Sequence, residues 1–163
     1  MVTICDKVPM ELFEPLLKLL SKNKVSKTTV TSNRRGFPLH HRAVCYGIIK
    51  ARYNNSIGLS YWSKKKPDIY EEIMKLGKII CPFPFSSIHL NNNVVCPKHK
   101  DNHNVGNSLL VSFGDYKGCN IVIGDVIYDA KYTPLIFNGA EIEHYNTDDL
   151  EGNKYSLIYY NIL

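Results

Sequence analysis

The chain has 163 residues and a mass of 18.6 kDa, so we expect one compact domain over residues 1–163. Apolar residues make up 44% and charged residues 21%, which excludes a disordered chain. The sequence has neither an apolar run of the ~20 residues that cross a bilayer nor a signal-peptide pattern at its amino terminus. We therefore expect an intracellular protein without membrane contact, located in the cytoplasm or nucleus of the host cell if the source is viral. We also expect a monomer.

Two helices are predicted first, followed by many short strands. Residues 9–20 have helical spacing of apolar side chains that Pro15 interrupts, which predicts a kinked helix or two short turns. A second helix over 67–76 starts at Pro67 and ends at Gly77. Strands are predicted at 44–50, 86–91, 107–113, 119–123, 126–129, 132–137 and 155–161. This order predicts an α+β, mainly β fold, namely a double-stranded β-helix (jelly roll, cupin-like) with N-terminal helices packed on one face.

The five cysteines are scattered, and no two of them form a C-x-x-C pair. This excludes a zinc ribbon and a thioredoxin-type motif. In a chain without a signal peptide we interpret them as free, mostly buried thiols.

His99 and Asp101 form a His-x-Asp triplet in the strand-rich half. On an extended backbone, residues i and i+2 point to the same side, so both side chains can bind one ion. His144, 43 residues after Asp101, can supply a third ligand from a distant strand. Two imidazoles and one carboxylate are the ligand set of non-haem Fe(II) oxygenases. The alternatives are polar residues of a surface loop, or a helical metal pair of His99 and His103.

The last predicted strand carries Lys154 at its start and Ser156 two residues later on the same face. A dicarboxylate co-substrate that chelates iron through its 2-oxo acid end needs such a pair at its distal carboxylate. Lys154 can form the charge-assisted bond, and Ser156 can add a hydrogen bond. The alternative is that Lys154 is a solvated side chain at a strand end.

Four motifs carry a family resemblance. They are Asn93-x5-His99-Lys-Asp-Asn-His-Asn104-x3-Ser108, Gly114-Asp-Tyr-x-Gly118, Phe137-Asn-Gly-x3-Glu-His144 and Lys154-Tyr-Ser156-Leu-x-Tyr-Tyr160. Together with Arg34-Arg-Gly-Phe-Pro-x3-Arg42, they resemble the TET and J-binding-protein type of 2-oxoglutarate/Fe(II) dioxygenase, which oxidises the methyl group of 5-methylpyrimidines in nucleic acid. The resemblance covers roughly residues 34–161.

The resemblance implies a role for each matching residue. It implies Fe(II) bound by His99, Asp101 and His144, 2-oxoglutarate bound by Lys154 and Ser156, a polar contact to the flipped base from Asn104, and stacking on that base by Tyr160. Plain core packing is the alternative for Tyr160. TET-type enzymes have arginine at the position of Lys154, so a forked bidentate bond to the co-substrate is lost here.

The implied activity is oxidation of the 5-methyl group of 5-methylcytosine or thymine, with O2 and 2-oxoglutarate as co-substrates. The alternatives are a protein (prolyl- or lysyl-type) hydroxylase of the same superfamily, which Lys154 favours, and a catalytically weak domain that binds modified nucleic acid. A methyl group inside a duplex is out of reach of a buried iron, so we expect a flipped base or a single strand.

The net charge of +5 is concentrated in one stretch. Residues 34–66 contain no Asp or Glu and hold 8 of the 20 cationic residues, namely Arg34, Arg35, Arg42, Lys50, Arg52 and Lys64–Lys66. Aromatic residues are interleaved with them. This pattern is typical of a surface that contacts phosphates, so we expect nucleic acid, DNA in the first instance, as the partner and Arg34, Arg35 and Arg42 as substrate contacts.

Overall fold

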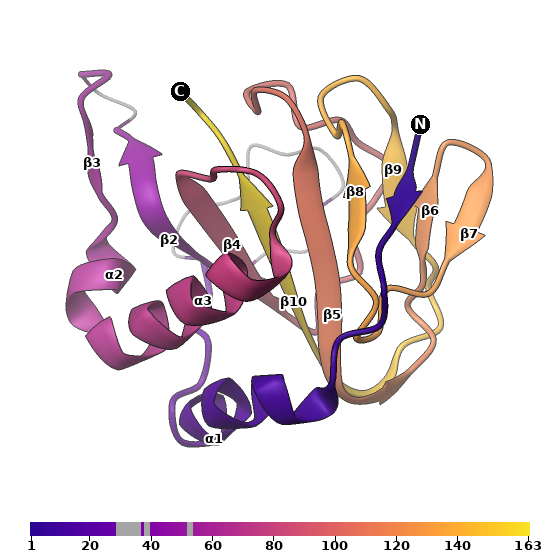
Figure 1. Cartoon of the computed structure of the whole chain (residues 1–163), viewed down its shortest axis with the longest axis horizontal. Helices are drawn as coiled ribbons and strands as arrows, with labels where there is room; N and C mark the ends of the chain where they lie inside the picture. The colour runs from indigo at the N-terminus through magenta and orange to yellow at the C-terminus, as the bar shows by residue number, and fades with distance from the viewer. Residues whose placement is uncertain (29–36, 38–39, 52–53) are drawn as a thin grey trace.

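Two antiparallel sheets form the frame of the computed structural model, which describes residues 1–28, 37, 40–51 and 54–163 (Figure 1). The seven-stranded sheet has the order β1 (Thr3–Ile4), β8 (Leu135–Phe137), β5 (Ser108–Lys117), β10 (Glu151–Tyr160), β4 (Ser87–Asn92), β2 (Arg42–Lys50) and β3 (Ile57–Leu59). The three-stranded sheet has the order β7 (Val126–Tyr128), β6 (Ile121–Ile123) and β9 (His144–Asn146). This arrangement confirms the predicted mainly β jelly roll.

Helices cover one face of the large sheet (Figure 1). A 3-10 helix, η1 (Met10–Phe13), leads into α1 (Glu14–Lys22), and a short α2 (Tyr61–Lys65) precedes α3 (Pro67–Ile80). The apolar sides of η1, α1 and α3 bury Phe13, Leu16 and Ile73 in one cluster with residues of the sheet. The predicted packing of the helices on one face is therefore confirmed.

Strict alternation along β5 and β10 separates the helix-covered face from the face that carries polar groups. Leu109, Val111 and Phe113 of β5 pack toward the helices, as do Tyr155, Leu157 and Tyr159 of β10. Because successive side chains of a strand point to opposite faces, the residues between them face the small sheet. On β10 these are Lys154, Ser156 and Ile158, so the opposite face of the large sheet can carry a site.

The structure differs from the sequence prediction at both helices. Pro15 lies in the first turn of α1, where a proline needs no hydrogen-bond partner, so it starts this helix and does not kink it. Gly77 lies inside α3, which continues to Ile80. The short elements β1, β3, α2 and β9 were not predicted.

Gly77 is required by packing. A β-carbon there would lie 2.4 Å from the Tyr159 ring and 2.6 Å from the Phe85 ring. These rings pack edge to face, and the Tyr159 hydroxyl donates to the Ile73 carbonyl, so neither ring can move away freely.

We expect Gly77→Ala to lower the free energy of unfolding by about 1–3 kcal/mol, the usual cost of overpacking a core. Helix propensity alone would change it by about 1 kcal/mol in the opposite direction. Urea denaturation followed by circular dichroism distinguishes the two, and an unchanged or raised stability would show that the rings have room to shift.

Within the part of the chain that the structure describes, every helix is too short or too polar to cross a bilayer.

Candidate metal centre

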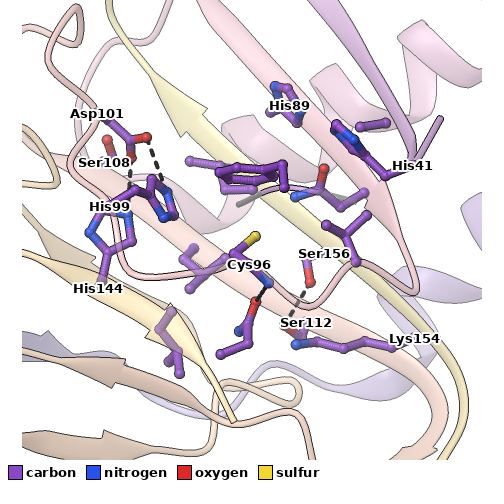
Figure 2. Close-up of a pocket in the computed structure, with 18 of the residues that line it drawn as sticks. His41, His89, Cys96, His99, Asp101, Ser108, Ser112, His144, Lys154 and Ser156 are labelled. Atoms are coloured by element: carbon purple, nitrogen blue, oxygen red, sulfur yellow. Dashed lines mark hydrogen bonds and ion pairs between the residues drawn. The ribbon is translucent and has the colours of Figure 1, made fainter. Parts of the chain in front are cut away.

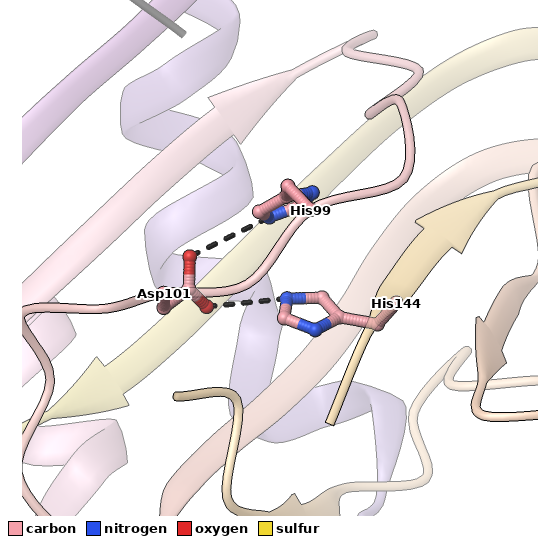
Figure 3. A group of neighbouring side chains, drawn as sticks. All are labelled: His99, Asp101 and His144. Carbon is pink, nitrogen blue, oxygen red and sulfur yellow. Dashed lines mark hydrogen bonds and ion pairs between the residues drawn. The ribbon is translucent and has the colours of Figure 1, made fainter. Parts of the chain in front are cut away.

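Three side chains converge at one edge of the space between the sheets (Figure 3). Nε2 of His99 lies 3.4 Å from Oδ1 of Asp101, and Nε2 of His144 lies 3.2 Å from Oδ2 of the same carboxylate. The three ligand atoms lie within 4.8 Å of one another. No other group of three such ligands occurs among the described residues. The structure thus brings together the triad that the sequence predicted.

Backbone pairing explains how residues far apart in the sequence meet. His99 and His144 form an antiparallel bridge in which each residue's N–H donates to the other's carbonyl, both at 3.0 Å. The Asp101 N–H donates to the carbonyl of Gly139 at 2.8 Å. The segment 99–103 is not helical, and His103 is exposed and outside the group, so the helical metal pair is wrong.

A second set of contacts orients the two imidazoles. Nδ1 of His99 lies 2.6 Å from the Pro97 carbonyl oxygen, and Nδ1 of His144 lies 2.9 Å from the Ile142 carbonyl oxygen. A carbonyl only accepts, so each Nδ1 carries a hydrogen and each Nε2 is the atom turned to the ligand position. Such contacts are the usual outer partners of metal-binding histidines.

The electrostatics of Asp101 also suit a cation. Burial alone would raise the pKa of Asp101, but its interactions with the His144 and His99 rings outweigh burial and hold this pKa well below its ordinary value. The carboxylate is therefore ionised at neutral pH. Two imidazole nitrogens and one carboxylate fit a non-haem Fe(II) site with open positions.

Gly139 leaves the room that this arrangement needs. A β-carbon at this position would lie 2.8 Å from Oδ2 of Asp101 and 3.2 Å from Cε1 of His144. A methyl group would therefore push against two ligands of the triad at once.

We expect Gly139→Ala to weaken metal binding by about 10–100-fold, as is common for changes beside the ligands. Titration of the metal-free protein with Mn²⁺ or Fe(II) under anaerobic conditions measures the effect. Gly58→Ala is the matched control, because nothing lies within 4 Å of its added β-carbon. Equal affinities of the two variants would contradict the proposed crowding.

The triad lines a cavity of about 670 Å³ between the sheets, within the size range of small-molecule sites. Figure 2 shows the triad on one side of it and Ser112, Lys154 and Ser156 on another. Asp101 is the only acidic residue among the described residues that line it, against Lys27, Lys154 and four histidines. Once a metal uses the carboxylate, the remaining lining favours an anionic ligand.

Lys154 is the most unusual side chain of the cavity wall, because it is a cation that is only 4% exposed. Its Nζ donates to the Cys119 carbonyl at 2.7 Å, lies 3.3 Å from the Cys119 thiol and sits over the Tyr116 ring at 5.5 Å. Among the described residues no carboxylate lies within 4 Å of it. Buried charges are normally paired, so an anion in the cavity would complete its environment.

Ser156 lies beside Lys154 on the same face, as predicted. Its hydroxyl is 3.1 Å from the hydroxyl of Ser112 on the neighbouring strand, and both are buried. The alternative of a solvated Lys154 at a strand end is wrong.

Asn104 and Tyr160 both line the cavity. The residues that follow them are bonded to each other, since the Val105 N–H donates to the Asn161 carbonyl at 2.8 Å. The Asn104 amide donates to the Ser108 hydroxyl at 3.4 Å. Tyr160 is half-buried and belongs to neither hydrophobic cluster of the described residues, so it is a wall residue and not a core residue.

The predicted phosphate contacts stay a prediction, because most of them lie outside the part of the chain that the structure describes. Arg34 and Arg35 lie outside the described residues, as does Arg52. Arg42 does not line the cavity, and its guanidinium donates to the Val25 carbonyl at 2.8 Å. Lys50 and Lys64 are exposed near the β2–β3 end of the sheet.

Several cavity residues were not found from the sequence. Ser112 could have been found, because it is a polar residue in an otherwise apolar stretch of β5. Cys119, His41 and His89 also line the cavity and were not predicted to do so, and neither was the place of Gly139 beside the triad.

No protein-family model and no curated protein matches the sequence. Solved structures do match over 98% of the chain. NgTET1 in complex with 5mC DNA is 14% identical, with a TM-score of 0.68 over 71% of that chain. OsALKBH1 is 12% identical, with a TM-score of 0.54 over 97% of that chain. A prolyl-4-hydroxylase from Pseudomonas putida is 10% identical, with a TM-score of 0.55 over 91% of that chain.

These likenesses establish the fold. An oxidoreductase of the 2OG-Fe(II) oxygenase family from Burkholderia pseudomallei also has a similar fold, with a TM-score of 0.54 and 12% identity. The match covers 98% of this chain and 84% of that chain. The jelly roll predicted from the order of the strands is thus the fold that these proteins share.

Proposed function

We propose, from the 2-oxoglutarate/Fe(II) oxygenase fold of this chain, that it is a dioxygenase that oxidises the 5-methyl group of a pyrimidine in nucleic acid. One observation carries the proposal: a two-histidine, one-carboxylate triad and a buried lysine without an acidic partner among the described residues line the same cavity. Fe(II) with 2-oxoglutarate and O2 would supply the oxidation of an unactivated C–H bond, with succinate and CO2 as co-products.

The triad would hold the metal through Nε2 of His99, Nε2 of His144 and the carboxylate of Asp101. The carbonyls of Pro97 and Ile142 fix both imidazoles, so little reorganisation is needed on binding. This oxidation needs no general base on this side of the cavity.

Lys154 and Ser156 would hold the distal carboxylate of 2-oxoglutarate. The ammonium group uses hydrogens on the Cys119 carbonyl and thiol and has a third N–H for a ligand. The Ser156 hydroxyl, linked to that of Ser112, adds a second hydrogen bond. The metal and this pair then bind the two ends of one dicarboxylate.

Asn104 and Tyr160 would receive the base. The amide of Asn104 can donate to or accept from a pyrimidine edge, and the Tyr160 ring can stack on its face. Both lie in the cavity and not on an open surface, so the base must leave a duplex or come from a single strand. NgTET1, whose solved complex contains 5mC DNA, has a similar fold and favours this substrate class.

The proposal is tested with Fe(II), 2-oxoglutarate and oligonucleotides that carry 5-methylcytosine or thymine, single-stranded and duplex. We expect succinate and an oxidised base in equal amounts, measured by chromatography and by mass analysis of the nucleosides. Succinate without any base product would contradict nucleic acid as the substrate.

Tyr160→Ala should raise KM for the oligonucleotide by roughly 5–100-fold, because stacking on an aromatic side chain contributes about 1–3 kcal/mol per base. Tyr160→Phe keeps the ring and should restore most of the binding. If both variants lose binding equally, the hydroxyl and not the ring makes the contact.

A protein hydroxylase is the second candidate. Lysine stands at position 154 in place of the arginine of TET-type enzymes, and the Pseudomonas putida prolyl-4-hydroxylase has a similar fold. Proline- and lysine-containing peptides in the same succinate assay distinguish the two activities, since only the true substrate couples succinate to a product.

A further inference from the structure

The pair Cys119 and Lys154 has chemistry that metal and co-substrate binding do not use. Sγ of Cys119 lies 3.3 Å from Nζ of Lys154, and both side chains are buried in the cavity wall. A separation of about 3–3.5 Å is the range in which bound groups react. The Cys119 thiol and the Lys154 amine are therefore close enough to react with each other once one of them is activated.

The surrounding turn fixes this distance. Cys119 has a left-handed backbone, with φ of 50°, and its N–H donates to Oδ1 of Asp149 at 2.8 Å. Asp149 is itself held by the Thr147 hydroxyl at 2.6 Å. A β-carbon at Gly118 would clash with the Asp149 carbonyl oxygen, so the backbone of Gly118 packs directly against that of Asp149. The Cys119 carbonyl binds the same Nζ, which keeps the amine beside the thiol.

We propose that Cys119 and Lys154 form a reversible covalent sulfenamide cross-link when peroxide enters the cavity. Peroxide is small enough to reach a thiol that lines a cavity of about 670 Å³ although the residue is only 2% exposed. An O2-activating centre is also a local source of peroxide when turnover is uncoupled. That source rests on the proposed function, but the cross-link itself does not.

The chemistry balances in two steps. The thiol attacks peroxide, so an S–O bond forms, the O–O bond breaks, sulfur loses two electrons and water leaves, which gives a sulfenic acid. The neutral amine of Lys154, after its ammonium form has given a proton to water, then attacks sulfur. The S–N bond forms, the S–O bond breaks, and the hydroxyl leaves as water with a proton from nitrogen. Thiol, amine and one peroxide thus give a sulfenamide and two waters, and a dithiol reverses it.

The cross-link would remove the cation from the co-substrate side of the cavity. Sulfenamide nitrogen carries no positive charge and keeps a single N–H, so the distal carboxylate would lose its charge-assisted partner. Oxidation would therefore switch off 2-oxoglutarate binding, and reduction would restore it.

Peptide mapping tests the cross-link independently of activity. The full-length protein is treated with hydrogen peroxide, free thiols are capped, and trypsin is added. We expect the peptide 118–131 joined to 132–163, with no cleavage at Lys154, and separation of the two peptides after dithiothreitol. Cys119→Ser and Lys154→Met should lose the joined species, and Cys81→Ser, a thiol outside the cavity, should keep it. Cys119 oxidised only to sulfinic or sulfonic acid, with normal cleavage at Lys154, would overturn the proposal.

Adding 2-oxoglutarate before peroxide separates the cross-link from the proposed function. Protection, seen as a lower yield of joined peptide, would support Lys154 as the co-substrate ligand. A full yield in its presence would leave the cross-link established and remove Lys154 from co-substrate binding.

Discussion

Replacing Asp101 with alanine should abolish turnover and lower metal affinity. The carboxylate lies between the two Nε2 atoms, and its removal leaves two imidazoles without a charge to balance a divalent cation. A bound metal contributes several kcal/mol to such a reaction. At tenfold per ~1.4 kcal/mol, the loss corresponds to a rate lower by about a thousandfold or more.

Succinate release and anaerobic metal titration measure this effect. His103→Ala is the matched control, because this histidine is exposed and outside the triad although it lies close in sequence. Circular dichroism shows whether Asp101→Ala remains folded, which we expect since the substitution removes no core packing. Retained turnover in Asp101→Ala would refute the triad, and loss of turnover in His103→Ala would show that the histidine assignment is wrong.

The triad could be predicted from the sequence because its signal is short-ranged. His99 and Asp101 differ by two positions, and an extended backbone places such residues on one side. His144 could be added to the triad because the short strands predicted between Asp101 and His144 can bring the chain back beside His99. What the sequence could not contain is the backbone bridge between His99 and His144 and the gap at Gly139, since both depend on long-range pairing.

The same contrast applies to the fold. Alternation predicted that Lys154 and Ser156 share a face, and the structure confirms it because β10 is regular over its whole length. Gly77 was interpreted as a helix end, since local rules treat glycine as a stop. Its real cause is a pair of rings, one from Phe85 in the loop after α3 and one from Tyr159 of β10, far along the chain.

Lys154→Met should raise KM for 2-oxoglutarate by roughly 10–100-fold and change kcat little. The substitution keeps the length of the side chain and removes the ammonium group. Hydrogen bonds to charged groups contribute about 1.5–3 kcal/mol, which at tenfold per ~1.4 kcal/mol gives this range. Because the distal carboxylate does not react, its contact binds the ground state and transition state equally, so the loss should fall on KM.

Lys131→Met is the matched control for this variant. Nζ of Lys131 also contacts Tyr116: it donates to the Tyr116 carbonyl at 2.9 Å and lies 4.8 Å from the centre of the Tyr116 ring. Lys131 does not line the cavity. Its removal should leave KM unchanged. A normal KM in Lys154→Met would remove the lysine from the co-substrate site, because no other described residue of the cavity wall presents a buried ammonium group. Equal increases in both variants would instead show that the Tyr116 region, and not the charge in the cavity, controls binding.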